Sequence, residues 1–203
     1  MASSSSSSAV TEDHVKYCFK VLIAYLKKEE LPEPHFPNDK YPLFVTWHKK
    51  SRYDNYELRG CIGNFNPMPL HEGLKKYALI SALRDTRFLP ITLAEIPQLS
   101  CAVSLLTNFE KVDDYLDWQI GKHGIWVEFI NPSTGIKDTA TYLPEVMVEQ
   151  QWTKEEAIKS VLRKGGYHGT FSPEYCKKYV KVTRYQSEKL EAFYSEGEII
   201  IKQ

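Results

Sequence analysis

The feature that most constrains the fold is a pair of strand-like runs joined by a short turn sequence. Residues 124–130 (GIWVEFI) and 136–143 (IKDTATYL) are rich in β-branched and aromatic side chains, and NPSTG lies between them. Asn-Pro and Gly supply the backbone conformations of a tight turn, so we predict an antiparallel hairpin here. The rest of the chain must be compatible with an antiparallel sheet.

Four other segments also predict strands. Residues 43–48 (LFVTWH) and 57–65 are strand-like, and the polar turn at 51–55 between them predicts a second hairpin. A short buried-type strand is expected at 101–106 (CAVSLL). Residues 179–186 (YVKVTRYQ) alternate polar and apolar side chains, which predicts a strand with one solvated face.

Helical spacing of apolar residues occurs three times. A first helix is expected from Thr11, with its apolar stripe at Val15, Cys18, Phe19, Leu22 and Leu26. A second stripe runs from Leu70 to about Leu83. The third helix starts at the capping box Thr153-Lys-Glu-Glu156 and runs to about Arg163, before two glycines.

Proline-rich segments between these elements predict loops. Residues 31–42 (LPEPHFPNDKYP) hold four prolines, which exclude a helix or a central strand across this stretch. NPMP at 66–69 and the acidic segment 113–117 predict turns. Helices alternate with hairpins and no regular βαβ repeat occurs, so the expected class is α+β with mainly antiparallel sheets and flanking helices.

The expected organisation is one domain at 11–203 after a disordered serine-rich tail at 1–10. The chain has 203 residues, 42% of them hydrophobic, which is enough to bury a core. It contains no secretory signal and no apolar run of the roughly 18 residues that span a bilayer, so we expect an intracellular protein of the cytoplasm or nucleus, without membrane association. Its four cysteines lack metal-site spacing and are expected to be free thiols.

The zero net charge conceals two oppositely charged segments. Residues 107–149 carry three basic and eight acidic side chains, and residues 153–190 carry nine basic and four acidic ones. Charge blocks are usually solvated surfaces, here two faces or lobes that attract each other. A basic partner-binding face is the alternative. Nucleic-acid binding is not expected, because only the second segment supports it.

The densest unusual stretch is Leu58-Arg59-Gly60-Cys61-Ile62-Gly63. Within a strand pattern, Gly60 and Gly63 indicate a bulge or a close backbone approach. Cys61 lies between them, and a neighbouring cation such as Arg59 would lower the pKa of its thiol and make it a nucleophile. The structural alternative is a buried Cys61 with the glycines serving a tight turn.

Three further segments carry functional groups. Arg84, Asp85 and Arg87 follow the second helix, where guanidinium groups suit a carboxylate or phosphate ligand, or simply complement the helix dipole. His123 lies between Gly121 and Gly124 and is a candidate proton acceptor or a structural histidine. At the end of the hairpin, a phenol and a carboxylate flank a proline and are candidates for binding a ligand or orienting a base: Tyr142 and Glu145.

The order LRGCIG, ALRDTRF, GKHGI, TYLPEV, WTKEEAI and TRYQ closely resembles the AMMECR family, over residues from about 11 to 194. The resemblance implies a single α+β domain of two unequal lobes, with the hexapeptide at the cleft between them. It also points to a eukaryotic member and to association with Memo-like proteins. The family's biochemical function is unsettled.

Two functions remain as hypotheses. In the first, a small-molecule or catalytic cleft uses Cys61 as the nucleophile and His123 as its base, with Arg59, Arg84 or Arg87 binding an anion. In the second, a non-catalytic module binds a protein partner, which the family resemblance suggests is Memo-like. The second is favoured by the absence of a complete triad, metal set, Walker loop or dinucleotide fingerprint, so the sequence names no cofactor.

Overall fold

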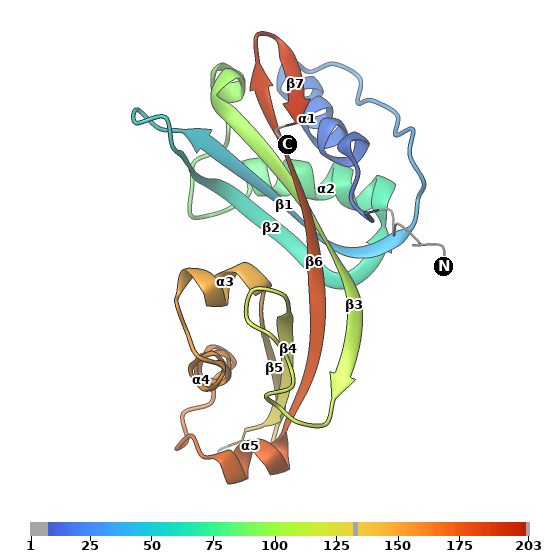
Figure 1. Ribbon diagram of the computed structural model, residues 1–203. Helices are drawn as coiled ribbons and strands as arrows, with labels where there is room; N and C mark the ends of the chain where they lie inside the picture. Colours follow the sequence, from blue (N-terminus) through green and yellow to red (C-terminus); the bar gives the residue numbers. More distant parts are fainter. Residues whose placement is uncertain (1–7, 132–133, 202–203) are drawn as a thin grey trace, which may run out of the picture. The chain divides into compact units, whose positions relative to one another are not determined.

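The framework of the protein is an antiparallel sheet with helices along the chain between its strands (Figure 1). The computed structural model describes residues 8–131 and 134–201. In chain order the elements are α1 (Glu12–Lys27), β1 (Lys40–Lys50), β2 (Tyr56–Pro69), α2 (Leu70–Leu83), the 3-10 helix η1 (Leu93–Gln98), β3 (Leu99–Val112), β4 (Gly124–Ile130), β5 (Lys137–Tyr142), α3 (Pro144–Glu149), α4 (Lys154–Lys164), α5 (Pro173–Tyr179), β6 (Val180–Ser195) and β7 (Glu198–Ile201).

The strand order is β2-β1-β3-β6-β4-β5, and β7 pairs with β6. The pairs β1–β2, β1–β3, β4–β5, β4–β6 and β6–β7 are antiparallel. The predicted α+β class is therefore confirmed, as are both predicted hairpins.

The chain divides into two compact units. Unit 1 contains the chain up to Leu106 and from Glu188 onward, and unit 2 contains Thr107–Ser187. β3 and β6 are each several residues longer than predicted, and a unit boundary falls within each of them, so both strands contribute residues to both units. The arrangement of the chain as two unequal lobes of one domain stays a prediction.

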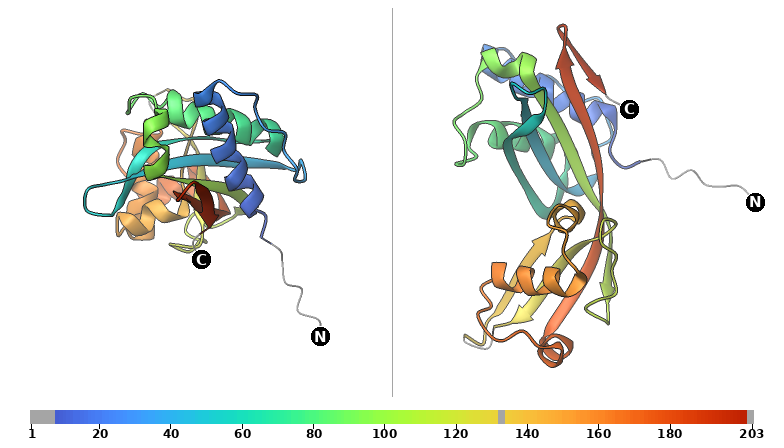
Figure 2. Two further views of the ribbon diagram at one scale, coloured as in Figure 1. Left: turned by 90° about the horizontal axis from the view of Figure 1, so that it is seen from above. Right: turned by 60° about the vertical axis from the view of Figure 1, so that its left-hand side comes forward.

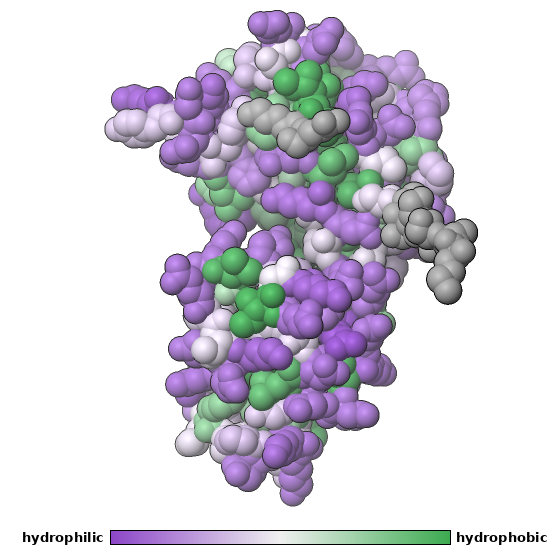
Figure 3. Space-filling model, viewed as in Figure 1, coloured by the Kyte–Doolittle hydropathy of each residue, from purple (hydrophilic) through white to green (hydrophobic). Residues whose placement is uncertain are grey.

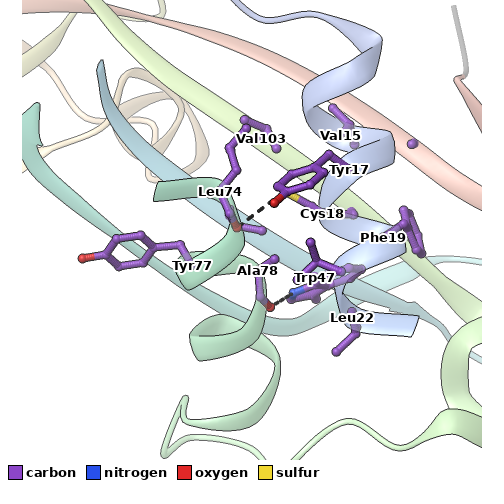
Figure 4. Close-up of a cluster of buried hydrophobic side chains, with 14 of the residues drawn as sticks. Val15, Tyr17, Cys18, Phe19, Leu22, Trp47, Leu74, Tyr77, Ala78 and Val103 are labelled. Carbon is purple, nitrogen blue, oxygen red and sulfur yellow. Dashed lines mark hydrogen bonds between the residues drawn. The ribbon is translucent and has the colours of Figure 1, made fainter. Parts of the chain in front are cut away.

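The core of unit 1 lies between α1, α2 and one face of β1. Figure 2 shows α1 and α2 on the same side of these strands. Phe19 of α1 packs edge-on against Trp47 of β1, with ring centroids 5.0 Å apart, and the Trp47 indole donates a hydrogen bond to the carbonyl of Ala78 in α2 at 3.1 Å (Figure 4). Cys18 is fully buried in the same cluster, as its place on the apolar stripe predicts.

The first residues that the structure describes already contact unit 1. The Ser8 hydroxyl and the Ala9 N–H both donate to the carboxylate of Glu188, and Val10 is buried. The folded chain therefore includes residues before Thr11, because they gain a carboxylate partner and a place in the core. The remainder of the predicted serine-rich tail, residues 1–7, lies outside the described residues.

Two proline-rich segments that were predicted as loops lie partly or wholly in strands. Pro42 lies inside β1, a central strand, and NPMP forms the end of β2. The β1–β2 ladder shifts register between Tyr41 and Leu43, so Pro42 sits at an irregularity. β2 is an edge strand, where a proline without an N–H is tolerated. The loop that remains before β1 supplies partners for α2: the Leu70 N–H donates to the Asp39 carbonyl at 3.0 Å.

Unit 2 has its own core, built by β4, β5, β6 and the helices around them. The predicted capping box of α4 is present: the Glu156 N–H donates to the Thr153 hydroxyl at 3.2 Å, and the Glu156 carboxylate accepts from the Thr153 N–H at 2.8 Å. α3 and α5 were not predicted, and Tyr179 ends α5 instead of starting a strand. Both helices are short and start with proline, which is favourable in the first turn.

The two charged segments meet within unit 2. Arg184 of the basic segment pairs with Glu110 of the acidic segment at 2.8 Å and with Asp117 at 3.1 Å. The interpretation of the segments as mutually attracting surfaces is therefore supported at these three residues.

Candidate functional site

The two glycines of the hexapeptide permit close backbone contacts in the middle of β2. A Cβ on Gly60 would overlap the carbonyl oxygen of Ser81 in α2, and one on Gly63 would overlap the carbonyl oxygen of Leu43 in β1. Neither glycine lies in a tight turn, since β2 runs continuously from Tyr56 to Pro69. The predicted close approach is confirmed, and it brings the end of α2 directly against the hexapeptide.

The segment after α2 holds both polar backbone groups of Cys61. The Asp85 carboxylate accepts the Cys61 N–H at 2.9 Å, and the Arg87 guanidinium donates to the Cys61 carbonyl at 3.2 Å. Arg87 also donates to both carboxylate oxygens of Asp85, at 2.9 and 2.7 Å. Asp85 is almost fully buried, with 7% of its surface exposed. The hydrogen bonds from Arg87 hold the pKa of the Asp85 carboxyl well below its ordinary value.

The Cys61 thiol faces away from the helices of unit 1. Cys61 pairs with Thr46 in the β1–β2 ladder, and the Thr46 hydroxyl donates to Cys61 Sγ at 3.1 Å. The next residue, Trp47, points toward α1 and α2, so the alternation of side chains puts Thr46 and Cys61 on the opposite face. Of the four cysteines, Cys61 is the one that is not buried.

Burial raises the pKa of the Cys61 thiol, although the Thr46 hydrogen bond and the charge of Arg87 act in the opposite direction. The prediction of a lowered thiol pKa is therefore wrong. Arg59, the cation proposed to lower it, is not among the charges that act on the thiol. It donates to the Glu95 carboxylate at 3.1 and 3.3 Å and to the Leu89 carbonyl at 2.7 Å.

The Glu95 carboxylate forms ion pairs with cations from two strands, Lys49 of β1 and Arg59 of β2. Lys49 Nζ lies 3.0 Å from the carboxylate oxygen that also accepts from Arg59. Burial would raise the pKa of Glu95, but hydrogen bonds from Arg59, Thr92 and Lys49 outweigh it and lower the pKa to about 2. Arg84 differs: it is exposed, and its guanidinium makes no hydrogen bond or ion pair with any residue that the structure describes.

The sheet face that carries Cys61 also carries a histidine–carboxylate pair that the sequence analysis missed. His48 lies two residues beyond Thr46 on the same strand face. Its Nδ1 lies 3.1 Å from the Glu191 carboxylate, which also accepts from the Ser100 hydroxyl at 2.6 Å. The alternation of β1 was the available signal for His48, but nothing in the sequence placed Glu191 beside it.

His123 lies in unit 2, where it stabilises its own loop. It is 5% exposed, and its Nδ1 accepts the N–H of Gln119 at 2.9 Å. Burial lowers its pKa, and the charges of Arg184 and Lys122 act in the same direction, so the imidazole is neutral with its proton on Nε2. Its role as the base for Cys61 stays a prediction.

Tyr142 and Glu145 also belong to unit 2. The Tyr142 hydroxyl lies 3.1 Å from the Ser160 hydroxyl, and the Lys164 ammonium lies 4.5 Å from the centroid of its ring. Glu145 is in the first turn of α3, where a negative charge is favourable. Of the predicted site residues, unit 1 thus brings together Arg59, Gly60, Cys61, Gly63, Asp85 and Arg87, with Arg84 beside them.

Within residues 8–131 and 134–201, no three His, Cys, Asp or Glu side chains are grouped so as to hold a metal ion. None of the helices in this part of the chain is both long enough and apolar enough to cross a membrane.

Comparison of the sequence with known proteins shows the family. The AMMECR1 family model matches residues 15–190. An uncharacterized protein of Arabidopsis thaliana is 49% identical over 180 residues, covering 89% of this chain and 84% of its own. An uncharacterized protein of Saccharomyces cerevisiae is 40% identical over 178 residues, covering 78% of this chain and 71% of its own.

A solved structure extends the likeness to the fold. The crystal structure of an uncharacterized protein from Pyrococcus horikoshii matches with a TM-score of 0.72 and 31% identity, covering 94% of this chain and 95% of that one. The family predicted from the six motifs is confirmed, and the chain belongs to the AMMECR1 family.

Proposed function

We propose that the protein acts on a small electrophilic molecule through the thiol of Cys61. The observation that carries the proposal is the pair of hydrogen bonds that fix the Cys61 backbone: its N–H donates to Asp85, and its carbonyl accepts from Arg87. It fixes the one cysteine that is not buried, on a sheet face that also presents His48. A fixed nucleophile close to a histidine–carboxylate pair is the arrangement that thiol-dependent chemistry requires.

The raised pKa of Cys61 specifies how such a site works. At neutral pH the sulfur is protonated, so the thiol must lose its proton as the substrate binds. The His48 imidazole, with Nδ1 directed at Glu191, has its Nε2 left to accept a proton directly or through water. Four free cysteines also fit an intracellular location, in the cytoplasm or nucleus, where thiols stay reduced.

Reaction with p-nitrophenyl acetate tests this proposal. The Cys61 sulfur attacks the ester carbonyl carbon, p-nitrophenolate leaves with the bonding electrons, and the thiol proton passes to the base. We expect a burst of p-nitrophenolate and one acetyl group on the Cys61 peptide, both lost in Cys61→Ser. A matching urea midpoint for the two proteins controls for folding. A burst of the same size in Cys61→Ser contradicts the proposal.

A protein-binding role is the second candidate, and exposed leucines near Arg59 favour it. Leu58 is 41% exposed, Leu93 45% and Leu89 82%. In the view of Figure 3, hydrophilic residues cover most of the surface and apolar ones form small groups. Three exposed leucines near one arginine offer an apolar surface to a protein partner. Recovery of a Memo-like protein on the immobilised chain, reduced by Leu89→Ala and by Arg84→Glu, would support it. If both variants recover as much of the Memo-like protein as the wild type does, the protein-binding role is contradicted.

A further inference from the structure

Two of the three cations expected to bind an anion near Cys61, Arg59 and Arg87, are already neutralised. Arg87 forms a two-pronged ion pair with Asp85, and Arg59 shares Glu95 with Lys49. A guanidinium that is saturated by a buried carboxylate offers little to a second anion. If the ligand is negatively charged, it needs a cation that is not already paired. Arg84 is exposed and makes no ion pair with the residues described, but it is not among the charges that act on the Cys61 thiol, whereas Lys189 is.

Lys189 is a cation on this sheet face that has no carboxylate of its own. It lies on β6, is exposed, and forms no ion pair or hydrogen bond with the residues described. Glu188, the preceding residue of the strand, accepts from Ser8 and Ala9, and Glu191, the carboxylate two residues further on the same face, accepts from the His48 imidazole and the Ser100 hydroxyl, at 3.1 and 2.6 Å. The Lys189 ammonium is therefore left to interact with a ligand.

The alternation of β6 directs Lys189 to the face of the thiol. Leu190 and Ala192 pack into the core of unit 1, so Lys189 and Glu191 point to the opposite face, which carries Thr46 and Cys61. The positive charge of Lys189 acts on two acidic groups of this face, the Cys61 thiol and the Glu191 carboxyl. It acts to lower the pKa of the Cys61 thiol, where burial has the larger, opposite effect, and it is one of the weaker causes that lower the pKa of Glu191.

We propose that Lys189 is the anion-recognising residue of the Cys61 site and that the ligand is a small anionic electrophile, bearing a carboxylate or phosphate near its reactive carbon. The inference rests on the proposed function. An anionic group on a molecule that reacts with Cys61 Sγ is attracted by the unpaired Lys189 ammonium on the same face, although β1 and β3 lie between the strands of the two residues. Lys189 then selects anionic over neutral molecules and is a specificity residue rather than a nucleophile.

Two alkylating reagents that differ in charge test the inference. Iodoacetate is anionic and iodoacetamide is neutral. With either reagent the thiolate sulfur displaces iodide from the same kind of carbon, and the thiol proton goes to solvent. The measurement is the ratio of the two second-order rates at the Cys61 peptide of the full chain, read by mass spectrometry. Any change in the thiol pKa alters both rates and cancels in the ratio.

We expect Lys189→Gln to lower the iodoacetate-to-iodoacetamide ratio about 2- to 5-fold, the effect of one partly screened charge contact. Lys20→Gln removes the same charge from α1, on the other side of the sheet, and leaves the ratio unchanged. High salt should bring the wild-type ratio close to that of Lys189→Gln. An unchanged ratio in Lys189→Gln, with labelling intact, overturns the role of Lys189 alone. No labelling by either reagent overturns the proposed function and this inference together.

Discussion

The carboxylate of Asp85 accepts the backbone N–H of Cys61 at 2.9 Å, across 24 positions of sequence. This bond ties the segment after α2 to the middle of β2. Arg87 completes the connection through the Cys61 carbonyl. The hexapeptide and the RDTRF segment, which the sequence presents as separate motifs, are therefore one structural element that positions a thiol.

Removal of the Asp85 carboxylate should destabilise unit 1. Asp85→Ala leaves the Cys61 N–H and the Arg87 guanidinium without their partner, and we expect the free energy of unfolding to fall by about 2–3 kcal/mol. Urea denaturation measures it. Asp54→Asn is the control, because it removes the charge of an exposed ion pair with Lys50 and keeps a side chain that tolerates the positive φ of this position, so its effect should be small. Equal losses in the two variants would mean that the Asp85 contacts are not stabilising.

Glu95 should make the stability of the protein depend on acid pH. Its folded pKa of about 2 lies below the ordinary value of 4.5, so the carboxylate contributes stability that is complete above about pH 5. That contribution is lost as the pH falls through 4 toward 2. We expect Glu95→Gln to be less stable than the wild type at pH 7, and the difference to shrink steadily below pH 4.5. A difference that is constant from pH 7 to pH 3 contradicts the assignment.

Gly60 should not tolerate a side chain. Gly60→Ala places a methyl group on the Ser81 carbonyl oxygen, so α2 must move away from β2, at a cost of about 3 kcal/mol or more. Gly135→Ala meets no atom within 4 Å but has φ +68°, so it measures backbone strain alone, about 1–2 kcal/mol. If Gly60→Ala is no more destabilising than Gly135→Ala in the same urea titration, the close contact is not rigid.

Local patterns predicted the elements well where a short segment specifies its own structure. The capping box of α4, the apolar stripe of α1 and the pairing of β4 with β5 each depend on residues that are close in sequence. The ends of β1 and β2 were mispredicted, because proline is excluded from a regular central strand but not from an edge strand or a register shift. Tolerance of this kind is decided by neighbouring strands, which the local sequence does not reveal.

The candidate site was predicted only in part, since its contacts join distant segments. The motifs supplied Cys61, Asp85 and Arg87, which the fold brings into contact. They did not identify Glu95 as the partner of Arg59, or Glu191 as the partner of His48, which lies 143 positions away. The direction of the Cys61 pKa was wrong because the charge of a nearby cation is visible in the sequence, while the burial that outweighs it is not.

Native-state alkylation of all four cysteines as a function of pH tests the central claim that Cys61 is the accessible, positioned thiol. We predict that iodoacetamide labels Cys61 at least about 10-fold faster than Cys18, Cys101 and Cys176, whose labelling requires local unfolding. The Cys61 rate should rise through an apparent pKa above the ordinary value of a free thiol, since burial raises it. Labelling of Cys61 at the same rate as the three buried cysteines, or an apparent pKa at or below that ordinary value, would contradict the account.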